Sequence, residues 1–600
     1  MTLVKELESV ESSKLRGRAA RAILDVLAGL PEAAQSARWG LSEAARRTPV
    51  ALALAVLSAL VLALTPAAQV QAVAWLIRDA ETFSTAAVPL VLLILLVGTG
   101  QVLATVDMFT RQRAGIRLQR TLQDSLVHSL ARMSPEDMAD SSVSADVQVG
   151  RDSLQDLGRL PWSVISSLAS LVTFVALFVS VWFIAPRAAI VIVLSLLPSV
   201  VLFSWAQTRQ TKAFGAVGGH LRRTTYLIEQ LAQQRSGTEI ATFGSGGRLA
   251  RQITQSQRRA DQLLDRLLAQ LIHGFLGGGV VGAALLGIAL SMIVFSGAGG
   301  AGIAAGVLGV LAGIEATRGA GFAIGEVLSA TPRVKIFRRV TSSADRPVDA
   351  AIVGRVESLE ARNVSVRYPG AKAPSLESAT IAVRRGEAIA LVGANGAGKT
   401  TLVRALLGIV ATAGGEVLLD GRLASDLALS ARLAHFGLMT QEFGRYELSI
   451  RDAVTLGTPD GVEVTEEDIW RALAVARMDK FVRNLDEGLD TQIGEQFGGI
   501  GLSGGQWQRI ALARIAVRGA GVWILDEPTS AVDAEAERDI FQELLQSRRD
   551  RITIVVSHRA WTLRGMDRIY VIDNARIVQC GTYEDLVTRE GRFRELFSDQ

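Results

Sequence analysis

The chain has few of the residues that build disulfides, metal clusters or nucleic-acid grooves. It is 600 residues long and contains a single cysteine, Cys580. One thiol excludes an intrachain disulfide and a cysteine-based metal cluster, and we expect it to be buried and inert. Aromatic residues make up only 6% of the chain, and no basic stretch is interleaved with them. A nucleic acid is therefore not expected as a partner.

Charged residues are also scarce, at 20%, whereas hydrophobic residues reach 49%. The hydrophobic residues are concentrated in long runs before residue 330, which indicates a membrane protein. A helix needs roughly 20 apolar residues to cross a bilayer. Six segments meet this requirement, and we predict transmembrane helices over residues 50–77, 85–106, 162–184, 188–206, 267–295 and 302–330.

Arginine and lysine are distributed unevenly around these segments. Residues 109–161 carry seven arginines, and residues 207–268 carry nine arginines and one lysine. The short loops on the opposite side hold only Arg78 and Arg187. Because loops rich in Lys and Arg stay in the cytoplasm, we expect both long segments and both termini there, in a multi-pass protein of the cell membrane.

Each long cytoplasmic segment has helical periodicity and few glycines or prolines. We therefore predict helices that continue out of the bilayer, turn near residues 138–144 and 236–243, and return, with a short helix at each turn. Residues 1–48 carry eight Lys or Arg and six Asp or Glu, with apolar residues at helical spacing. This pattern predicts a cytoplasmic amphipathic segment on the membrane surface. Its apolar residues are Ile23, Val26, Leu27 and Leu30.

A phosphate-binding motif lies in the last 245 residues. The apolar run 387–392 predicts a buried strand, which leads into Gly393-x-x-x-x-Gly398-Lys399-Thr400 and then a helix over 402–407. Glycines let backbone N–H groups wrap phosphates, and the helix N-terminus adds a positive dipole. Lys399 is expected at the β- and γ-phosphates and Thr400 at Mg²⁺. The predicted nucleotide-binding residues here are Gly393, Asn395, Gly396, Ala397, Gly398, Lys399, Thr400 and Thr401.

A second apolar strand, 522–525, ends in Asp526 and Glu527. An acid at the end of such a strand suits a Mg²⁺ ligand, so Asp526 is a candidate for that role. The adjacent Glu527 is placed to polarise an attacking water as a general base.

These elements and others in the same order resemble the nucleotide-binding domain of an ABC transporter. The resemblance covers about 240 residues. It implies ATP and Mg²⁺ as cofactors, with Tyr368 stacking on adenine, Gln441 sensing Mg²⁺ and His558 acting as the switch histidine. Segment 502–506 (Leu-Ser-Gly-Gly-Gln) matches the signature motif, and segment 528–533 matches the D-loop ending in Asp533. The implied catalytic residues are Gln441, Asp526, Glu527 and His558, and the implied magnesium ligands are Thr400, Gln441 and Asp526.

The resemblance also implies assembly. In the family the signature motif closes over the ATP of the partner subunit, so one chain carries half of each site. The signature residues here are Ser503, Gly504, Gly505 and Gln506. All the ATPase motifs are intact, which favours a homodimer, although a heterodimer with a separate partner stays open.

The predicted fold is thus a multidomain membrane protein, in which an all-α domain of six transmembrane helices precedes an α/β P-loop ATPase domain. Residues 1–48 are the N-terminal segment, 49–340 the transmembrane domain with its two cytoplasmic extensions, 341–354 a linker, and 355–600 the nucleotide-binding domain.

Two features of the chain resemble exporters of this family in particular. Segment 494–496 is similar to the X-loop, and six spans fused upstream of the ATPase domain match the exporter half-transporter plan. The resemblance implies export of an amphipathic or hydrophobic substrate by alternating access. Segments 441–449 and 505–509 resemble variants from bacterial exporters of ribosomal peptides. A lipid or multidrug flippase, an importer and an ATP-gated channel of the same architecture stay open.

Three polar or small-residue features fall within the predicted spans. Glu315 and Arg318 are spaced to pair on one helix face, either as a structural pair or as a polar spot in a substrate path. His273 has the same two interpretations. The pair Gly278 and Gly282 is spaced for close helix packing.

Overall fold

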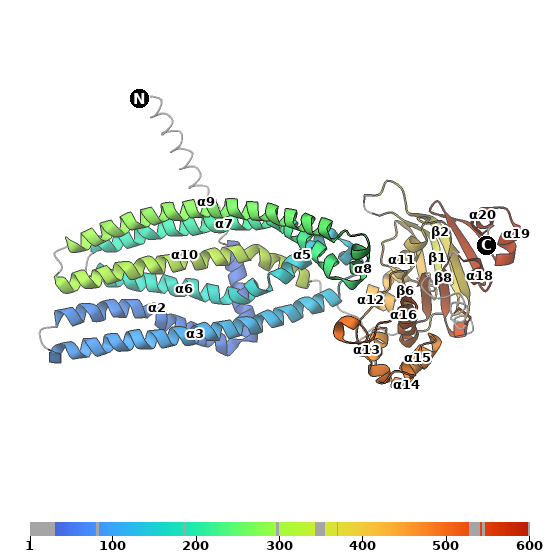
Figure 1. The fold of residues 1–600 in the computed structure, drawn as a ribbon, viewed down its shortest axis with the longest axis horizontal. Coiled ribbons are helices and arrows are strands. Elements are labelled where there is room, and N and C mark those ends of the chain that lie inside the picture. Colours follow the sequence, from blue (N-terminus) through green and yellow to red (C-terminus); the bar gives the residue numbers. More distant parts are fainter. Residues whose placement is uncertain are drawn as a thin grey trace, which may run out of the picture. The chain divides into compact units, whose positions relative to one another are not determined.

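The computed structural model describes residues 31–79, 83–183, 186–295, 299–342, 354–368, 370–459, 461–526, 541–542, 547–557 and 559–597. The chain forms a helical unit, residues 1–133 and 138–345, and a second, mainly α/β unit, residues 134–137 and 346–600. Each is described by itself. Figure 1 shows long helices running side by side in the first unit and a sheet-containing core in the second.

The N-terminal half consists of helices joined by short connections. The longest exceed 40 residues, which at about 1.5 Å per residue is longer than a bilayer is thick. Their bounds are α2 (Pro49–Arg78), α3 (Phe83–Ala131), α4 (Pro135–Ala139), α5 (Ser141–Asp152), α6 (Leu154–Trp182), α7 (Pro186–Ala232), α8 (Gln234–Thr242), α9 (Gly246–Val294) and α10 (Gly300–Ser342).

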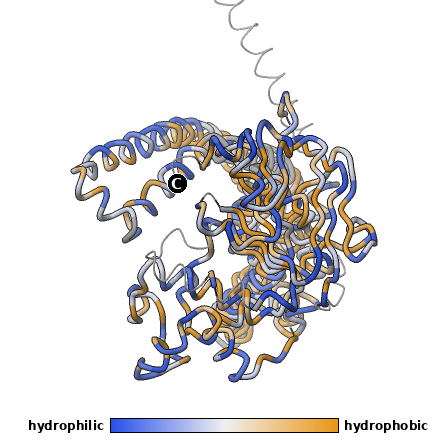
Figure 2. The backbone as a smooth tube through the Cα atoms, turned by 90° about the vertical axis from the view of Figure 1, so that its right-hand side faces the viewer, coloured by the Kyte–Doolittle hydropathy of each residue, from blue (hydrophilic) through white to orange (hydrophobic). Residues whose placement is uncertain are grey.

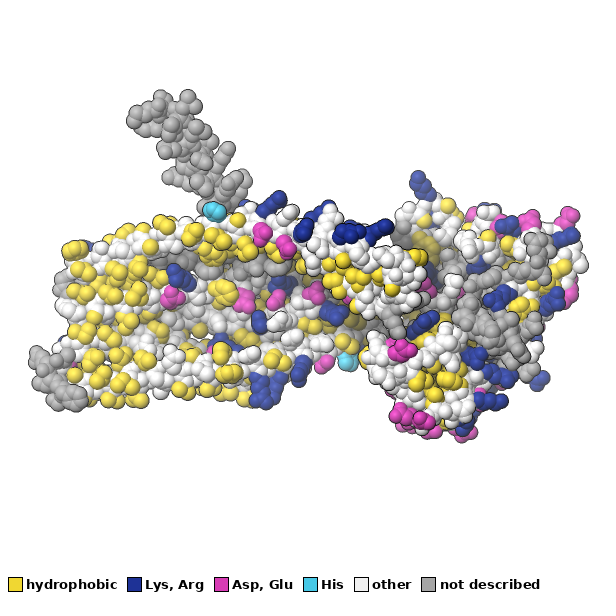
Figure 3. Space-filling view, viewed as in Figure 1, with side chains coloured by type: hydrophobic (Ala, Val, Ile, Leu, Met, Phe, Trp, Pro, Cys, Tyr) yellow, Lys and Arg dark blue, Asp and Glu magenta, His cyan; other side chains and the backbone are white. Residues whose placement is uncertain are grey.

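Five of the described helices, α2, α3, α6, α9 and α10, are long and apolar enough to cross a membrane. They contain five of the six predicted spans, and the predicted fourth span falls within α7. Many of their apolar side chains are exposed; Val280, for example, is 70% exposed. On the face drawn in Figure 3, hydrophobic side chains cover one half of the helical unit, and Lys and Arg gather on its other half. This division is the one expected for helices that leave the bilayer and extend into water.

The helices pack in two groups that α10 connects. α7 packs along α9, α2 packs against α3 and α6, and α10 contacts α2, α6 and α7. Glycines on α9 allow the close approach of α7, because an added Cβ at Gly274 or Gly278 would overlap Trp205 or Leu202. The glycines of α9 that face α7 are therefore Gly274 and Gly278. This pair lies one helical turn before the predicted pair, Gly278 and Gly282. A Cβ at Gly282 would meet no atom within 4 Å.

The described part of the N-terminal segment, residues 31–47, is a helix. It packs on other helices of the unit, and its expected position on the membrane surface stays a prediction. Trp39 contacts Phe337 of α10 with ring centroids 6.0 Å apart, and Glu32 pairs with Lys335 at 2.7 Å. The buried residues of this helix are small, so the helix can lie close to its neighbours in the unit. They include Ala33, Ser36, Gly40 and Ala44. The predicted apolar residues Ile23, Val26, Leu27 and Leu30 lie outside the described residues.

The two predicted turns each contain a short helix. Helix α4 follows α3 at the first turn, and α8 lies between α7 and α9 at the second. Each short helix starts after only one to three non-helical residues. The prediction of a short helix at each turn is confirmed.

The α/β unit contains two sheets. The antiparallel sheet has the strand order β2-β1-β4-β5, and the larger sheet has the order β10-β9-β3-β8-β7-β6. The strands are β1 (Ser358–Val366), β2 (Leu376–Arg384), β3 (Ala388–Val392), β4 (Gly414–Leu419), β5 (Arg422–Leu423), β6 (Phe436–Met439), β7 (Val522–Asp526), β8 (Ile552–Val556), β9 (Arg568–Asp573) and β10 (Arg576–Gly581).

The helices of this unit are short and contribute to three hydrophobic clusters. They are α11 (Lys399–Leu407), η2 (Ala424–Asp426), α12 (Leu429–Ala434), α13 (Ile450–Thr455), α14 (Glu466–Val475), α15 (Asp479–Arg483), η3 (Gly488–Asp490), η4 (Glu495–Phe497), α16 (Gly504–Arg518), η5 (Ser547–Asp550), α18 (Ala560–Leu563), α19 (Tyr583–Thr588) and α20 (Arg592–Phe597). Helix α11 packs with the sheets around β3. Helices α13, α14 and α16 form a separate helical cluster.

Strands β3 and β8 are buried along their whole length, as parallel strands rich in apolar residues should be. Figure 2 shows hydrophobic (orange) and hydrophilic (blue) residues interspersed along the chain. Cys580 lies at the end of β10 and is exposed, so the expectation of a buried thiol was wrong.

Candidate functional site

Four parallel strands end at one edge of the larger sheet, and each leads into a predicted site residue. Strand β3 pairs with β8, β8 with β7, and β7 with β6, all in parallel. The register aligns Leu391 with Val556, Val556 with Asp526, and Leu525 with Met439. The phosphate loop, Asp526 and Gln441 therefore leave the sheet at the same edge, where ligands of open α/β sheets bind.

The phosphate loop connects β3 to α11 through glycines in conformations that other residues avoid. Gly393 has φ +155°, and an added Cβ there would overlap the carbonyl oxygen of Ile572. Gly398 has φ +115° and forms the N-cap of α11. The loop thus delivers the chain directly to a helix N-terminus, whose first N–H groups are suited to binding an anion.

Lys399 and Thr400 open that helix. The Nζ of Lys399 donates to the carbonyl oxygens of Gly393 at 2.8 Å and Ala394 at 3.0 Å, so the lysine folds over its own loop. Thr400 is exposed, whereas Thr401 is buried against the core. Asn395 and Gly396 are exposed at the tip of the loop, and Ala397 is buried at its base. The predicted strand, glycine-rich loop and helix are present, and phosphate binding by the loop stays a prediction.

Arg432 supports the far end of the same helix and was not singled out from the sequence. It is 8% exposed, and its guanidinium donates to the carbonyl oxygens of Ala405 at 2.8 Å and Leu406 at 2.7 Å. Burial lowers the pKa of Arg432 to about 10, so it remains charged at neutral pH. A cation at a helix C-terminus stabilises the helix through its dipole, and Arg432 thereby holds α11 in place.

Tyr368 lies in the loop after β1 and is half-buried. Its hydroxyl accepts a hydrogen bond from Nη1 of Arg404, on α11, at 3.4 Å. The contact brings the predicted adenine-stacking residue to the helix that carries the phosphate loop.

Asp526 is the last residue of β7 and is half-buried, and Gln441 is exposed two residues after β6. Glu527, Asp533 and His558 lie outside the described residues, so their predicted roles remain predictions.

The two residues flanking position 558 are described. Ser557 Oγ accepts from the N–H of Arg559 at 3.1 Å and lies 2.7 Å from Thr562 Oγ1. This buried hydroxyl pair, which the sequence did not point out, holds the turn after β8.

The signature motif begins helix α16. Ser503 is its N-cap, and the side chains of Ser503 and Gln506 form a capping box. Gly504 and Gly505 occupy the first turn, while Trp507, which follows Gln506, is buried in the helical cluster. The exposed Ser503 side chain and the first-turn N–H groups form a second potential anion site.

The X-loop segment forms the short helix η4. Gly494, just before it, has φ +105°, and the amide of Gln496 donates to the Glu447 carboxylate. The segment is therefore tied to the loop that precedes α13.

The helical unit contains a polar cluster that the sequence reading missed. Asp107 and Arg111 on α3 form an ion pair at 2.7 Å, with side chains only 11% and 16% exposed. Ser58 on α2 donates to Asp107, and Arg111 donates to Ser166 Oγ on α6 at 2.7 Å. Asp107 directly follows the predicted second span, so only the spacing of Asp and Arg by four residues could have indicated the pair.

The predicted pair on α10 is present. Arg318 Nη1 lies 3.0 Å from Glu315 Oε1, and the side chains are 60% and 72% exposed. His273 is exposed, and its Nδ1 lies 2.5 Å from the carbonyl oxygen of Ala269 on its own helix. Whether either feature touches a substrate stays a prediction.

Comparison with known proteins finds similar sequences and a similar fold. Residues 376–530 match the sequence profile of the ABC transporter family. The chain is 35% identical over 238 residues to ATP-binding/permease proteins of Staphylococcus aureus strains NCTC 8325 and COL, whose names propose multidrug export. The aligned region spans 40% of this chain and 40% of each relative.

The fold is similar to that of a bacterial Atm1-family ABC exporter with ATP bound. The TM-score is 0.78 and the sequence identity 21%, and the superposition covers 92% of this chain and 98% of that structure. Among the described helices, five are long and apolar enough to cross a membrane. Residues 376–530 are therefore similar in sequence to ABC transporters, and the chain has a fold similar to that of an ABC exporter.

Proposed function

We propose that this chain is one subunit of a homodimeric exporter that hydrolyses ATP to move an amphipathic or hydrophobic substrate out of the cytoplasm. The observation that carries the proposal is the common edge at which β3, β6 and β7 end, because it gathers the phosphate loop, Gln441 and Asp526. The same chain supplies the membrane helices through which a substrate would pass.

ATP binding needs only local rearrangement. Lys399 already lies over the phosphate loop, so exchanging its two carbonyl acceptors for phosphate oxygens keeps its position. The first N–H groups of α11 lack intrahelical partners and would donate to the same phosphates. Tyr368 would then stack on the adenine.

The residues at this edge also suit Mg²⁺. The candidates Thr400, Gln441 and Asp526 offer a hydroxyl, an amide and a carboxylate oxygen, which are the hard ligands that Mg²⁺ prefers. No group of three His, Cys, Asp or Glu side chains gathers in the described part of the chain. This agrees with Mg²⁺, which takes one or two carboxylates and completes its shell with phosphates and water. When bound, it would neutralise charge on the phosphates.

Hydrolysis then depends on this chain and its partner. Glu527 would orient and polarise the attacking water, and His558 would contact the terminal phosphate. Ser503 and the first-turn N–H groups of α16 would close over the ATP held by the partner subunit. Each chain would contribute both halves, so two intact sites form in a homodimer.

The substrate class follows from the nature of the helical unit. Its helices are apolar, with isolated polar features such as the Glu315–Arg318 pair. A cavity between two such units would accept molecules with an apolar body and a few polar groups. Peptides, lipids and hydrophobic cations all fit this description, and the names of the relatives propose multidrug export.

The proposal is tested with the purified protein reconstituted into liposomes of defined orientation. The wild-type chain should accumulate a hydrophobic cation, peptide or lipid on the side opposite the ATP. Glu527→Gln should retain ATP binding but lose hydrolysis by about 10²-fold or more, as expected for a missing general base. Lys399→Ala should weaken ATP binding itself. Accumulation on the ATP side would indicate an importer, and ion conductance without accumulation would indicate a channel; either outcome would refute export.

A further inference from the structure

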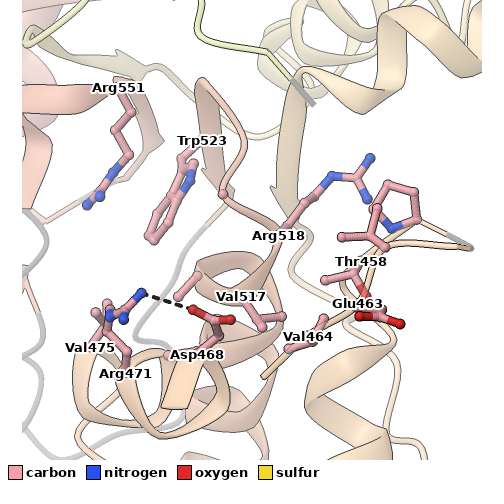
Figure 4. A pocket seen from close by; sticks show the side chains of 15 residues that line it. Thr458, Glu463, Val464, Asp468, Arg471, Val475, Val517, Arg518, Trp523 and Arg551 are labelled. Atoms are coloured by element: carbon pink, nitrogen blue, oxygen red, sulfur yellow. Dashed lines mark hydrogen bonds and ion pairs between the residues drawn. The ribbon is translucent and has the colours of Figure 1, made fainter. Parts of the chain in front are cut away.

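Two hollows of the protein differ in how their neighbouring charges are used. One, in the α/β unit, has a volume of 710 Å³ and lies beside α14 and α16 (Figure 4). There Arg471 pairs with Asp468 at 3.0 Å, and Arg518 donates to the carbonyl oxygens of Gly457 and Leu433. Both guanidiniums thus have partners within the unit. The other hollow is a groove on the helical unit, where apolar surface lies beside exposed arginines.

The groove lies on the first turns of α2, just after Thr48 leaves the helical conformation. It has a volume of 460 Å³, and every residue that lines it is apolar. Pro49, Leu52, Val56 and Leu60 are among them, and their spacing places them on one face of α2. Exposed side chains of this stretch are large, and Val50 is 72% exposed. The described residues therefore leave this apolar surface uncovered.

The groove extends past the level at which the neighbouring helix becomes charged. Figure 1 shows α2 and α3 side by side, and the two helices pack together. Ser58 of α2 donates to Asp107, the first charged residue of α3. Residues 49–57 lie beyond this contact and form about 13 Å of uncharged helix beside the arginine-rich part of α3. This apolar surface thus lies where the helices reach the headgroup region of a bilayer.

One exposed arginine adjoins the groove directly. Arg46 follows the lining residue Ala45, and its side chain is 76% exposed. Its guanidinium lies 3.7 Å from the carboxylate of Glu43, whereas Arg47 binds the same carboxylate at 2.8 Å. Glu43 is therefore balanced mainly by Arg47, and the charge of Arg46 remains available to an anion.

Two further arginines increase the positive potential around the groove. Arg38 is exposed and precedes Ala45 by seven residues, so both lie on one face of the helix of residues 31–47. On α3, Ala114 belongs to the same buried cluster as Ala55 of α2. The exposed Arg113 is therefore level with the groove. Positive side chains at this level attract anionic lipids.

We propose that the groove binds a phospholipid with an anionic headgroup, whose acyl chain covers Leu52, Val56 and Leu60 and whose phosphate pairs with Arg46. The chain removes apolar surface from water, which is favourable in proportion to the area covered. The phosphate accepts charge-assisted hydrogen bonds from the guanidinium. This site requires that α2 crosses a bilayer, and it does not depend on the direction of transport.

The test compares two photoactivatable phospholipids that carry the same diazirine acyl chain, a phosphatidylglycerol and a phosphatidylcholine. Each is added at equal mole fraction to phosphatidylcholine nanodiscs that hold the full-length protein. After irradiation, labels are mapped in the tryptic peptide 48–78. The anionic probe should label residues 49–60 about fivefold more strongly, or more, as expected for one arginine at a membrane surface. Equal labelling would mean that the groove takes bulk lipid without selection, and would overturn the proposal.

Two variants separate the headgroup contact from the chain contact. Arg46→Gln should reduce the preference for the anionic probe about fivefold. Its matched control is Arg187→Gln, which removes an exposed arginine at the start of α7 that does not line the groove and should leave the preference unchanged.

Ala53→Trp fills the groove from an exposed position, so it should fold normally and remove the preferential labelling of residues 49–60. An undiminished preference in Arg46→Gln would show that the phosphate binds elsewhere. The same result in Ala53→Trp would show that the chain binds elsewhere, and either outcome would overturn the site. A loss in Arg187→Gln equal to that in Arg46→Gln would reduce the effect to net charge and would also overturn it.

Discussion

Ser503 and Gln506 hold each other at the start of α16 through two reciprocal hydrogen bonds. The N–H of Gln506 donates to Ser503 Oγ at 3.3 Å, and the N–H of Ser503 donates to Gln506 Oε1 at 2.8 Å. The signature residues thus have their helical geometry without a second subunit. A partner's ATP would meet a helix N-terminus that is already formed.

Removing this reciprocal cap should reduce both stability and ATP hydrolysis. Gln506→Ala takes away the acceptor for the Ser503 N–H, and losing a cap costs about 1 kcal/mol. We expect a lower melting temperature and reduced ATPase activity per folded protein. The control is Asp585→Ala, which removes the capping box that Thr582 forms at α19. It should lower stability similarly while ATPase activity stays normal; equal activity loss in both variants would refute a local role for the cap.

The buried cluster of Asp107 and Arg111 should be important for the stability of the helical unit. Asp107→Ala leaves the Arg111 charge buried without its partner, and such a loss costs about 3–5 kcal/mol. Replacing both, as Asp107→Leu with Arg111→Met, should be less harmful than the single change. Ser166→Ala, which removes one neutral acceptor, should cost about 1.5–3 kcal/mol at most. Thermal unfolding in detergent measures all three, and an unaffected Asp107→Ala protein would contradict the assignment.

Much of the α/β unit could be predicted because its signals are local. Glycines at 393 and 398, a buried strand before them and a helix after them specify the phosphate loop. Alignment of Asp526 and Gln441 at one sheet edge also follows from apolar strands that end just before them. Arg432 could not be predicted, because its acceptors at the end of α11 are 26 and 27 residues away in the chain.

The helical unit was harder to predict, since apolar runs indicate a span but not its neighbours. Glycines at 278 and 282 had the right spacing for helix contact, yet α7 meets Gly274 and Gly278. Residues 31–47 have an amphipathic pattern that suits either a bilayer surface or other helices. Their small buried residues favour close helix packing, which the pattern of large apolar residues did not indicate.

Cys580 should be accessible to alkylating reagents but slow to react at neutral pH. It is exposed, yet partial burial raises the pKa of its thiol above the ordinary value of 9.0, against a smaller opposite effect of Arg568. Because the thiolate is the nucleophile, a higher pKa lowers the reactive fraction at pH 7. The rate of iodoacetamide labelling should therefore rise with pH through a midpoint above 9.0. Arg568→Gln should move that midpoint higher, and a midpoint below 8 would contradict the prediction.

The composite ATP site predicts that two inactive variants can restore each other. In the proposed homodimer, Lys399 and Ser503 act on the same ATP from different chains. Lys399→Ala and Ser503→Arg homodimers should each be nearly inactive, because both of their sites are damaged. A mixed dimer places both lesions in one site and leaves the other site intact.

Mixed dimers should therefore regain ATP hydrolysis, up to about half of the wild-type rate per dimer if one site turns over alone. The measurement uses two affinity tags, so that only dimers with one copy of each variant are assayed. A mixture of Lys399→Ala with a second damaged phosphate-loop variant, Thr400→Ala, is the matched control. Both of its sites remain damaged, so it should stay inactive. Full activity in either homodimer would be decisive against the model, because a site completed by the partner's Ser503 could not tolerate loss of that residue or of Lys399.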